Sequence, residues 1–218
     1  MSTLLHLDAS ARRESHSRNL AATFAKAWLE AEPNSTYAYR DLAAHPVPFI
    51  SQAWTELCDY VLEHGITDPA RLHEAARTPR QQEAWAVVEP LLAEVVAADV
   101  LLIGTPMYNY SVPAGLKAWI DQITFPRASL ELQVVVASAR GGSYVSGAPR
   151  AAVDHQERYL RDFFAGHFGV TDVTFVNLEY VNSTVDPTLA HRREEYERSV
   201  EEAHQTAAEL GRKLASAA

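Results

Sequence analysis

The stretch Asp99-Val-Leu-Leu-Ile-Gly104 (DVLLIG) indicates the fold of this chain most clearly. It is a continuous apolar run with the length of a buried strand, and Leu132 to Ser138 (LQVVVAS) repeats the pattern further along the chain. A strand covered on both faces is apolar throughout, whereas a strand with one wet face alternates apolar and polar residues. These two runs therefore predict a sheet that helices cover on both sides.

Three more strands are expected, at Leu4–Ala9, Ser35–Asp41 and Val170–Leu178. Apolar residues at helical spacing and start signals such as Thr78-Pro79 predict helices between and after the strands: from Ser17, over 51–63, 79–98, 113–124 and 150–166, and from Pro187 onward. Strands that alternate with helices predict an α/β three-layer sandwich with a five-stranded parallel sheet in the order 2-1-3-4-5. Because the composition shows no break, residues 1–218 are expected to form a single domain.

Composition narrows the function classes. The chain has 218 residues, a formal net charge of −9 and one cysteine, Cys58. Its acidity argues against a nucleic-acid partner, and no apolar stretch approaches the length of a membrane span. One cysteine cannot form an internal disulfide, which favours a reducing, cytoplasmic location. Cys58 is expected to lie in the middle of a helix and to serve in packing. The nine histidines show no paired ligand spacing, so no metal site is expected.

Ligands of parallel α/β sheets bind at the carboxyl ends of the strands, so the loops 9–17, 105–112 and 139–148 are the candidate site. The first loop carries Ser10, Ser15 and Ser17 just before a predicted helix. Free amides and the helix dipole favour an anion there, and serine hydroxyls can donate to phosphate oxygens. Arg12, Arg13 and Arg18 make the segment locally positive. The alternative is an ordinary serine-capped helix.

The second loop contains large polarisable side chains, where loops are usually small and polar: Pro106, Met107, Tyr108, Asn109 and Tyr110. Methionine and tyrosine can line the face of a planar heteroaromatic ligand, and an asparagine amide can bond to a ring edge. The alternative is a dimer contact or a packing cluster, and a site at a subunit interface would combine the two.

The third loop places Gly141 and Gly142 directly after a strand, together with Arg140. Glycine permits positive φ and a close approach of the backbone to a ligand. Arg140 could favour negative charge that develops on such a ligand. The alternative is a tight turn with a solvated arginine.

Together these loops resemble the FMN-dependent NADH:azo/quinone reductases, which are flavodoxin-like flavoenzymes. The resemblance lies in S-x-x-x-x-S-x-S after the first strand, P-M-Y-N-Y after the third and A-R-G-G-S-Y after the fourth, and it runs along nearly the whole chain. It implies a flavodoxin-like FMN-binding domain over residues 1–218 and a homodimer with the FMN site at the interface. The residues it implies for FMN are Ser10, Ser15, His16 and Ser17 at the phosphate, and Pro106, Met107, Tyr108, Asn109, Tyr110, Ala139, Arg140, Gly141 and Gly142 around the flavin ring.

The resemblance also implies the reaction. NADH or NADPH would deliver hydride to tightly bound FMN, and a quinone or azo compound would then take two electrons in a ping-pong cycle. The flavin does the chemistry, so no protein nucleophile is expected, and Arg140 or Tyr144 is the candidate to stabilise reduced flavin. The alternatives are an electron-transfer flavodoxin-like protein and a flavin-binding regulatory module without turnover.

Two departures from the family pattern concern the pocket. Ala139 stands where the family commonly has serine, and the segment from the predicted helix 113–124 to the fourth strand is short, with only 124–131 between them. Phe163, Phe164, His167 and Phe168 could cover part of the site in its place, although packing within their helix is the preferred interpretation.

Overall fold

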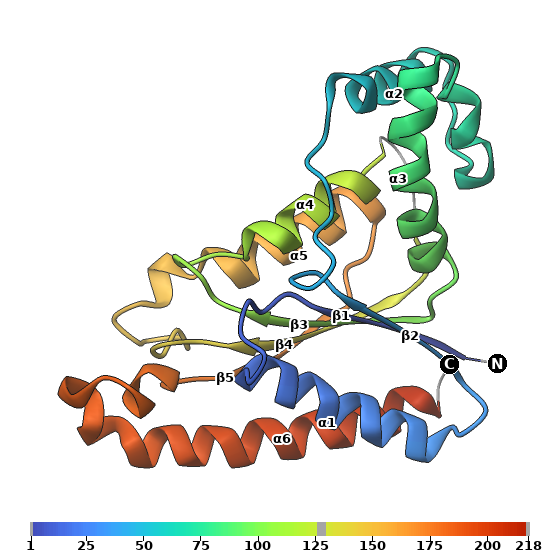
Figure 1. Cartoon of the computed structure of the whole chain (residues 1–218). Helices are drawn as coiled ribbons and strands as arrows, with labels where there is room; N and C mark the ends of the chain where they lie inside the picture. The colour runs from blue at the N-terminus through green and yellow to red at the C-terminus, as the bar shows by residue number, and fades with distance from the viewer. Residues whose placement is uncertain (1, 126–129, 217–218) are drawn as a thin grey trace.

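The computed structural model describes residues 2–125 and 130–216, and its centre is a parallel sheet of five strands (Figure 1). The strands follow the order β2-β1-β3-β4-β5, as predicted. Their bounds are β1 (Thr3–Asp8), β2 (Thr36–Asp41), β3 (Val100–Pro106), β4 (Gln133–Ala139) and β5 (Val173–Leu178). The two apolar runs are neighbours, with Leu101 of β3 opposite Val134 of β4, and every residue of β3 is buried.

Helices cover both faces of the sheet and complete three layers (Figure 1). One face packs against α1 (His16–Ala31) and α6 (Arg193–Ala215), which lie side by side. The other face packs against α3 (Pro79–Val96), α4 (Ala114–Ile123) and α5 (His155–Phe168). The alternation of side chains along each strand divides the core: Leu4 and Leu102 face α1 and α6, whereas Leu5 and Ile103 face the opposite layer.

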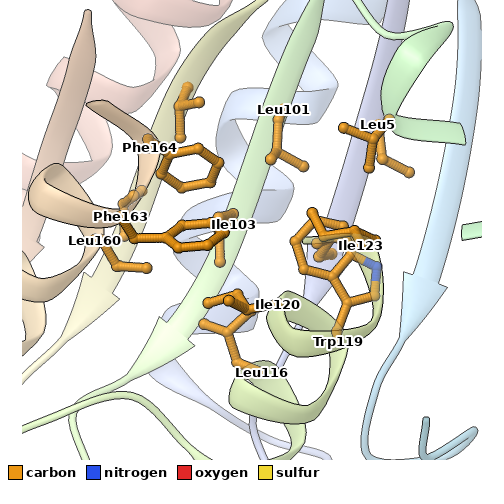
Figure 2. Close-up of a cluster of buried hydrophobic side chains, with 14 of the residues drawn as sticks. Leu5, Leu101, Ile103, Leu116, Trp119, Ile120, Ile123, Leu160, Phe163 and Phe164 are labelled. Carbon is orange, nitrogen blue, oxygen red and sulfur yellow. The ribbon is translucent and has the colours of Figure 1, made fainter. Parts of the chain in front are cut away.

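Aromatic side chains of α5 belong to this core. Figure 2 shows Phe163 and Phe164 in the same cluster of buried side chains as Ile103 of β3 and the apolar face of α4. Phe164 and Phe168 are almost fully buried, and His167 is exposed. The packing interpretation is therefore confirmed for the three phenylalanines.

A third apolar cluster joins α2 (Gln52–Glu63) and the 3₁₀ helix η1 (Pro69–Ala75) to α3. Cys58 lies in α2 with 9% of its surface exposed. Burial and the nearby Asp59 raise the pKa of the Cys58 thiol to about 12, so it stays protonated and unreactive. Its predicted packing role is confirmed.

Three element starts differ from the sequence prediction. The N-cap of α1 is Ser15, not Ser17, which lies inside the helix. Before α5 and α6 the chain forms short 3₁₀ helices, η2 (Ala151–Val153) and η4 (Pro187–Arg192). The Asp154 side chain caps α5 by accepting hydrogen bonds from the amides of Gln156 and Glu157. Periodicity alone does not separate such a 3₁₀ turn from the helix that follows it.

Candidate functional site

The three candidate loops lie next to one another, because they follow the neighbouring strands β1, β3 and β4. Two backbone hydrogen bonds join the strand ends: Ala9 N donates to Gly104 O at 2.9 Å, and Met107 N donates to Ala139 O at 2.9 Å. The backbone of Ala139 is thus used in the sheet, whichever side chain it carries. The fold brings the sequence-predicted residues to one edge of the sheet.

The first loop, residues 9–17, is called the serine loop below, and it leaves the start of α1 without a side-chain cap. Ser15 is the N-cap residue but its side chain makes no cap hydrogen bond, since its hydroxyl is bonded to that of Ser17 at 3.0 Å. The first amides of a helix have no partner within it. Ser10, Ser15 and Ser17 are buried, with 1%, 6% and 0% of their surface exposed. Hydroxyls and open amides at a helix start fit a phosphate.

Arg18 has a different place from the one its sequence position suggested. Its guanidinium forms two hydrogen bonds of 2.8 Å to the carboxylate of Asp41 at the end of β2. It also lies 3.3 Å from Asp8 of β1. The hydrogen bond from Arg18 lowers the pKa of Asp41 to about 2. Because two carboxylates balance its charge, Arg18 is not a free cation for a phosphate.

The same guanidinium also binds the backbone of the serine loop. Arg18 Nη2 donates to Ser10 O at 2.7 Å, and Arg18 Nε donates to Arg12 O at 3.0 Å. The backbone of the loop is therefore tied, through Arg18, to the end of β2. Arg12 and Arg13 are exposed on the outside of the loop. With Arg18 already paired, Arg12 and Arg13 are the cations of the first loop that lie next to the open helix start in the sequence.

His16 presents a neutral ring at this helix start. Burial lowers its pKa, and the charge of Arg12 and the nearby His204 lower it further. The ring packs edge-on against Tyr196 of α6, with Tyr196 Oη 3.4 Å from His16 Nδ1. At neutral pH His16 can therefore offer one ring N–H, and not a positive charge.

The turn after β3 has a strained backbone. Asn109 has φ 49° and Tyr110 has φ 67°, and Tyr108 and Ser111 exchange two backbone hydrogen bonds of 3.0 Å around them. Such a turn normally uses glycine or asparagine, and positive φ costs a bulky residue free energy. Residues Tyr108 and Tyr110 are 37% and 46% exposed. A strained turn that displays two aromatic rings is typical of a binding site.

Gln156, a residue that the sequence did not single out, fixes the end of β3 from which this turn starts. Its side chain is fully buried, and Nε2 donates to Pro106 O at 2.9 Å. Oε1 accepts from the Ser138 hydroxyl at 2.6 Å. One amide thus joins α5 to the ends of β3 and β4. The sequence signal was slight, since glutamine in a first helical turn is usually exposed.

The two glycines after β4 are used for close packing. Neither has a positive φ, contrary to the role that glycine suggested there. A Cβ on Gly141 would lie 2.6–2.9 Å from the side-chain amide of Asn182, and one on Gly142 would lie 3.2 Å from Arg150 Nη1. Asn182 and Arg150 are further residues that sequence reasoning missed. Arg150 belongs to the same β4–α5 connection as the glycines, whereas Asn182 comes from η3 (Val181–Thr184), a segment distant in sequence.

Arg140 also differs from its expected role. Its side chain is 2% exposed, and Nη1 lies 2.8 Å from Asp154 while Nη2 lies 3.2 Å from Glu157. Glu179 is 4.0 Å away. Three carboxylates surround this guanidinium, so it is not the solvated arginine of the alternative interpretation. Its charge is not directed freely toward a ligand, and we regard Arg140 as a residue that positions the loop.

Tyr144 lies between that buried cluster and the strained turn. The guanidinium of Arg140 is 5.8 Å from the centre of its ring, and Tyr110 meets it edge-on at 6.5 Å. Its amide donates to Glu179 at 2.8 Å. The structure thus brings Tyr144 beside the second loop, which the sequence alone did not specify.

Cavities adjoin all three loops. One of about 410 Å³ lies beside the first loop, between Arg13 and Ala43. One of about 590 Å³ lies against the Tyr108–Asn109 turn and extends to Tyr159. A third, of about 500 Å³, adjoins Gly141 and Gly142.

Of the short segment 124–131, Phe125 and Leu130 are buried, and 126–129 lie outside the described residues.

Comparison with known proteins gives one family. The chain matches the family model described as flavodoxin-like fold over residues 2–201. It is 62% identical to the FMN-dependent NADH:quinone oxidoreductase of Nocardia farcinica, over 97% of this chain and 99% of that protein. It is 38% identical to the protein of that name from Streptomyces coelicolor, over 98% and 96%.

Solved structures support the fold. An azoreductase from Bacillus anthracis superposes with a TM-score of 0.76 at 23% identity, over 98% of this chain and all of that one. An FMN-dependent NADH-azoreductase from the same species, in complex with FMN, gives a TM-score of 0.73 at 19% identity, over 96% of this chain and 100% of that one. Within the described residues, no helix is both long and apolar enough to cross a membrane.

Proposed function

The chain belongs to the flavodoxin-like family that includes the FMN-dependent NADH:quinone oxidoreductases, and we propose that it is an enzyme of that kind. It would bind FMN, take hydride from NADH and reduce a quinone by two electrons in a ping-pong cycle. The observation that carries the proposal is the uncapped, serine-lined start of α1 beside a strained turn with two exposed tyrosines. Azo compounds are the second acceptors we propose, since they share the flat conjugated shape.

The residues present fit FMN. The buried hydroxyls and open amides at the start of α1 suit its phosphate, and a neutral His16 can add one N–H. The residues proposed to hold FMN are Ser10, Ser15, His16, Ser17, Pro106, Met107, Tyr108, Asn109, Tyr110, Ala139, Arg140, Gly141 and Gly142. Bound FMN would supply the hydride and two-electron chemistry, for which side chains have no equivalent.

The protein's own contribution is orientation and exclusion of water. Gln156 fixes the ends of β3 and β4. Arg140 fixes the start of the third loop through its ion pairs with Asp154 and Glu157. The tyrosine rings of the second loop provide flat apolar surface where water would otherwise lie. Tyr144, whose ring meets that of Tyr110 edge-on, is the remaining candidate to stabilise reduced flavin. No residue is assigned as a nucleophile.

The test uses the purified protein and its colour. We expect a yellow protein that NADH bleaches without air and that menadione then recolours. Each bleaching and recolouring cycle should consume one NADH and one quinone per bound FMN. Colour without bleaching would favour the regulatory module. Reoxidation by a protein partner in one-electron steps, but not by menadione, would favour the electron carrier. A colourless protein that takes up no FMN would contradict all three.

We also propose that residues 1–218 act as one FMN-binding domain and pair as a homodimer with the FMN site at the interface. Large apolar side chains are exposed near the candidate loops and on the segment before α2: Phe49 (79%), Ile50 (41%), Tyr108 (37%), Tyr110 (46%) and Val145 (58%). Sedimentation should give a dimer mass for the wild type and a monomer for Phe49→Asp. A wild-type monomer at micromolar concentration would contradict the pairing.

A cytoplasmic location completes the proposal. The proposed donor, NADH, is consumed in that compartment, and Cys58 is the sole cysteine of the chain. Fractionation of cells that express the chain would check this location. Recovery outside the cytoplasmic fraction would contradict it.

A further inference from the structure

The cavity of about 500 Å³ beside Gly141 and Gly142 has an unusual lining. It lies between the β4–α5 loop and the segment that contains η3 (Val181–Thr184) and η4. Two arginines, Arg150 and Arg192, line it with serine hydroxyls and apolar groups, and the described residues that line it include no aspartate or glutamate. In a chain with a net charge of −9, a cavity with this lining favours an anion.

Arg150 carries most of this preference. Within the described residues its guanidinium has no carboxylate partner within 4.0 Å, and it is exposed. Its Nη1 lies 3.2 Å from the position that a Cβ on Gly142 would take, so its charge reaches the third loop. Arg192 is less available, because it pairs with Glu195 at 2.7 Å. The Arg192 guanidinium also lies 6.0 Å from the centre of the Tyr180 ring.

We propose that this cavity binds the pyrophosphate of the dinucleotide donor, an assignment that rests on the proposed function. The cavity shares Gly141 and Gly142 with the proposed flavin site, so a donor that reaches the flavin can extend into it. A cavity of ~500 Å³ is of the size that takes a drug-sized group. Arg150 would bond to the pyrophosphate oxygens, and Tyr180 and Leu189 would give apolar surface to the adenosine end. FMN's own phosphate is proposed at α1, after a different strand.

The test is anaerobic stopped-flow reduction of the holoenzyme by NADH, with ADP-ribose binding measured by calorimetry. ADP-ribose carries the pyrophosphate and adenosine without the nicotinamide. For Arg150→Gln we expect the dissociation constants of NADH and of ADP-ribose to rise about tenfold, because a charge-assisted hydrogen bond is lost. Arg150→Lys should recover part of the affinity. Reoxidation of the reduced enzyme by menadione should keep its wild-type rate.

Arg193→Gln is the matched control, since Arg193 neighbours Arg192 but does not line the cavity. If Arg150→Gln and Arg193→Gln give the same NADH and ADP-ribose constants, the assignment is wrong and the proposed function stands. If Arg150→Gln weakens only an anionic quinone, such as a naphthoquinone sulfonate, the cavity serves the acceptor and the assignment is again wrong. A wild-type holoenzyme that NADH does not reduce would contradict the function itself, and the assignment with it.

Discussion

Replacement of Arg18 by glutamine is expected to lower the free energy of unfolding by about 3 kcal/mol, because it leaves carboxylates unpaired. The side chain of Asp8 is 5% exposed and that of Asp41 22%, so water cannot fully replace the lost guanidinium. Tyr39 would still donate to Asp8 at 2.8 Å, which limits the loss. Urea unfolding of the apoprotein measures this change.

The second expected effect of Arg18→Gln is weaker FMN binding. The serine loop loses its two backbone anchors, at Ser10 O and Arg12 O, and its hydroxyls are no longer held in place for the phosphate. Arg18→Lys keeps the charge but cannot span the two carboxylates and the loop, so it should restore stability more than FMN affinity. Fluorescence titration of FMN measures the affinity.

Lys26→Gln is the control in the same helix, because Lys26 is 77% exposed and forms only a distant pair with Glu30. Surface pairs of this kind contribute little to stability. If Arg18→Gln is no less stable than Lys26→Gln, the network around Arg18 does not support the fold. If Arg18→Gln binds FMN as the wild type does, the loop does not depend on its anchors.

The sequence predicted the sheet because its signal is local. The apolar runs at 99–104 and 132–138 have the length of a strand, are too short for a typical helix, and are apolar throughout, as strands covered on both faces are. The strand order then placed the three loops at one edge, and the structure has them there. For the same reason, the packing of Cys58 and of Phe164 was predictable from the helices that carry them.

The parts of the site that escaped prediction depend on contacts across the chain. Arg18 meets Asp41 over 23 positions, and Gln156 meets Pro106 over 50. No periodicity records such pairs. The sequence indicated that Arg18 and Arg140 carry charge, but not that carboxylates already balance both. The strained φ of Tyr110 was equally hidden, since tyrosine favours other backbone conformations.

Arg140→Met should give the other large loss of stability, about 3–5 kcal/mol at pH 7, because it leaves charged groups buried without a partner. Asp154, Glu157 and Glu179 would keep their negative charges around an apolar side chain. Arg161 still bonds to Glu157 at 2.8 Å, but within the described part of the chain it forms no ion pair with Asp154 or Glu179. Tyr144 would lose the guanidinium that covers its ring.

The pH dependence separates this charge effect from a simple packing defect. Burial raises the pKa of Glu157, but the hydrogen bond from Arg161 and the charge of Arg140 outweigh it, so the pKa lies below its ordinary value of 4.5. In the wild type this group therefore stabilises the fold above pH 4.5, and the contribution is lost as the pH falls through the lowered pKa. Without the charge of Arg140, burial weighs more on Glu157, so this carboxylate takes up its proton at a higher pH than in the wild type, and its unfavourable charge is then removed. The stability difference between Arg140→Met and wild type should accordingly shrink between pH 7 and about pH 5, as measured by urea unfolding at each pH.

Arg158→Met, in the same helix and 81% exposed, should show little loss at either pH. An Arg140→Met deficit that is equal at both pH values would point to lost packing and would contradict the electrostatic account.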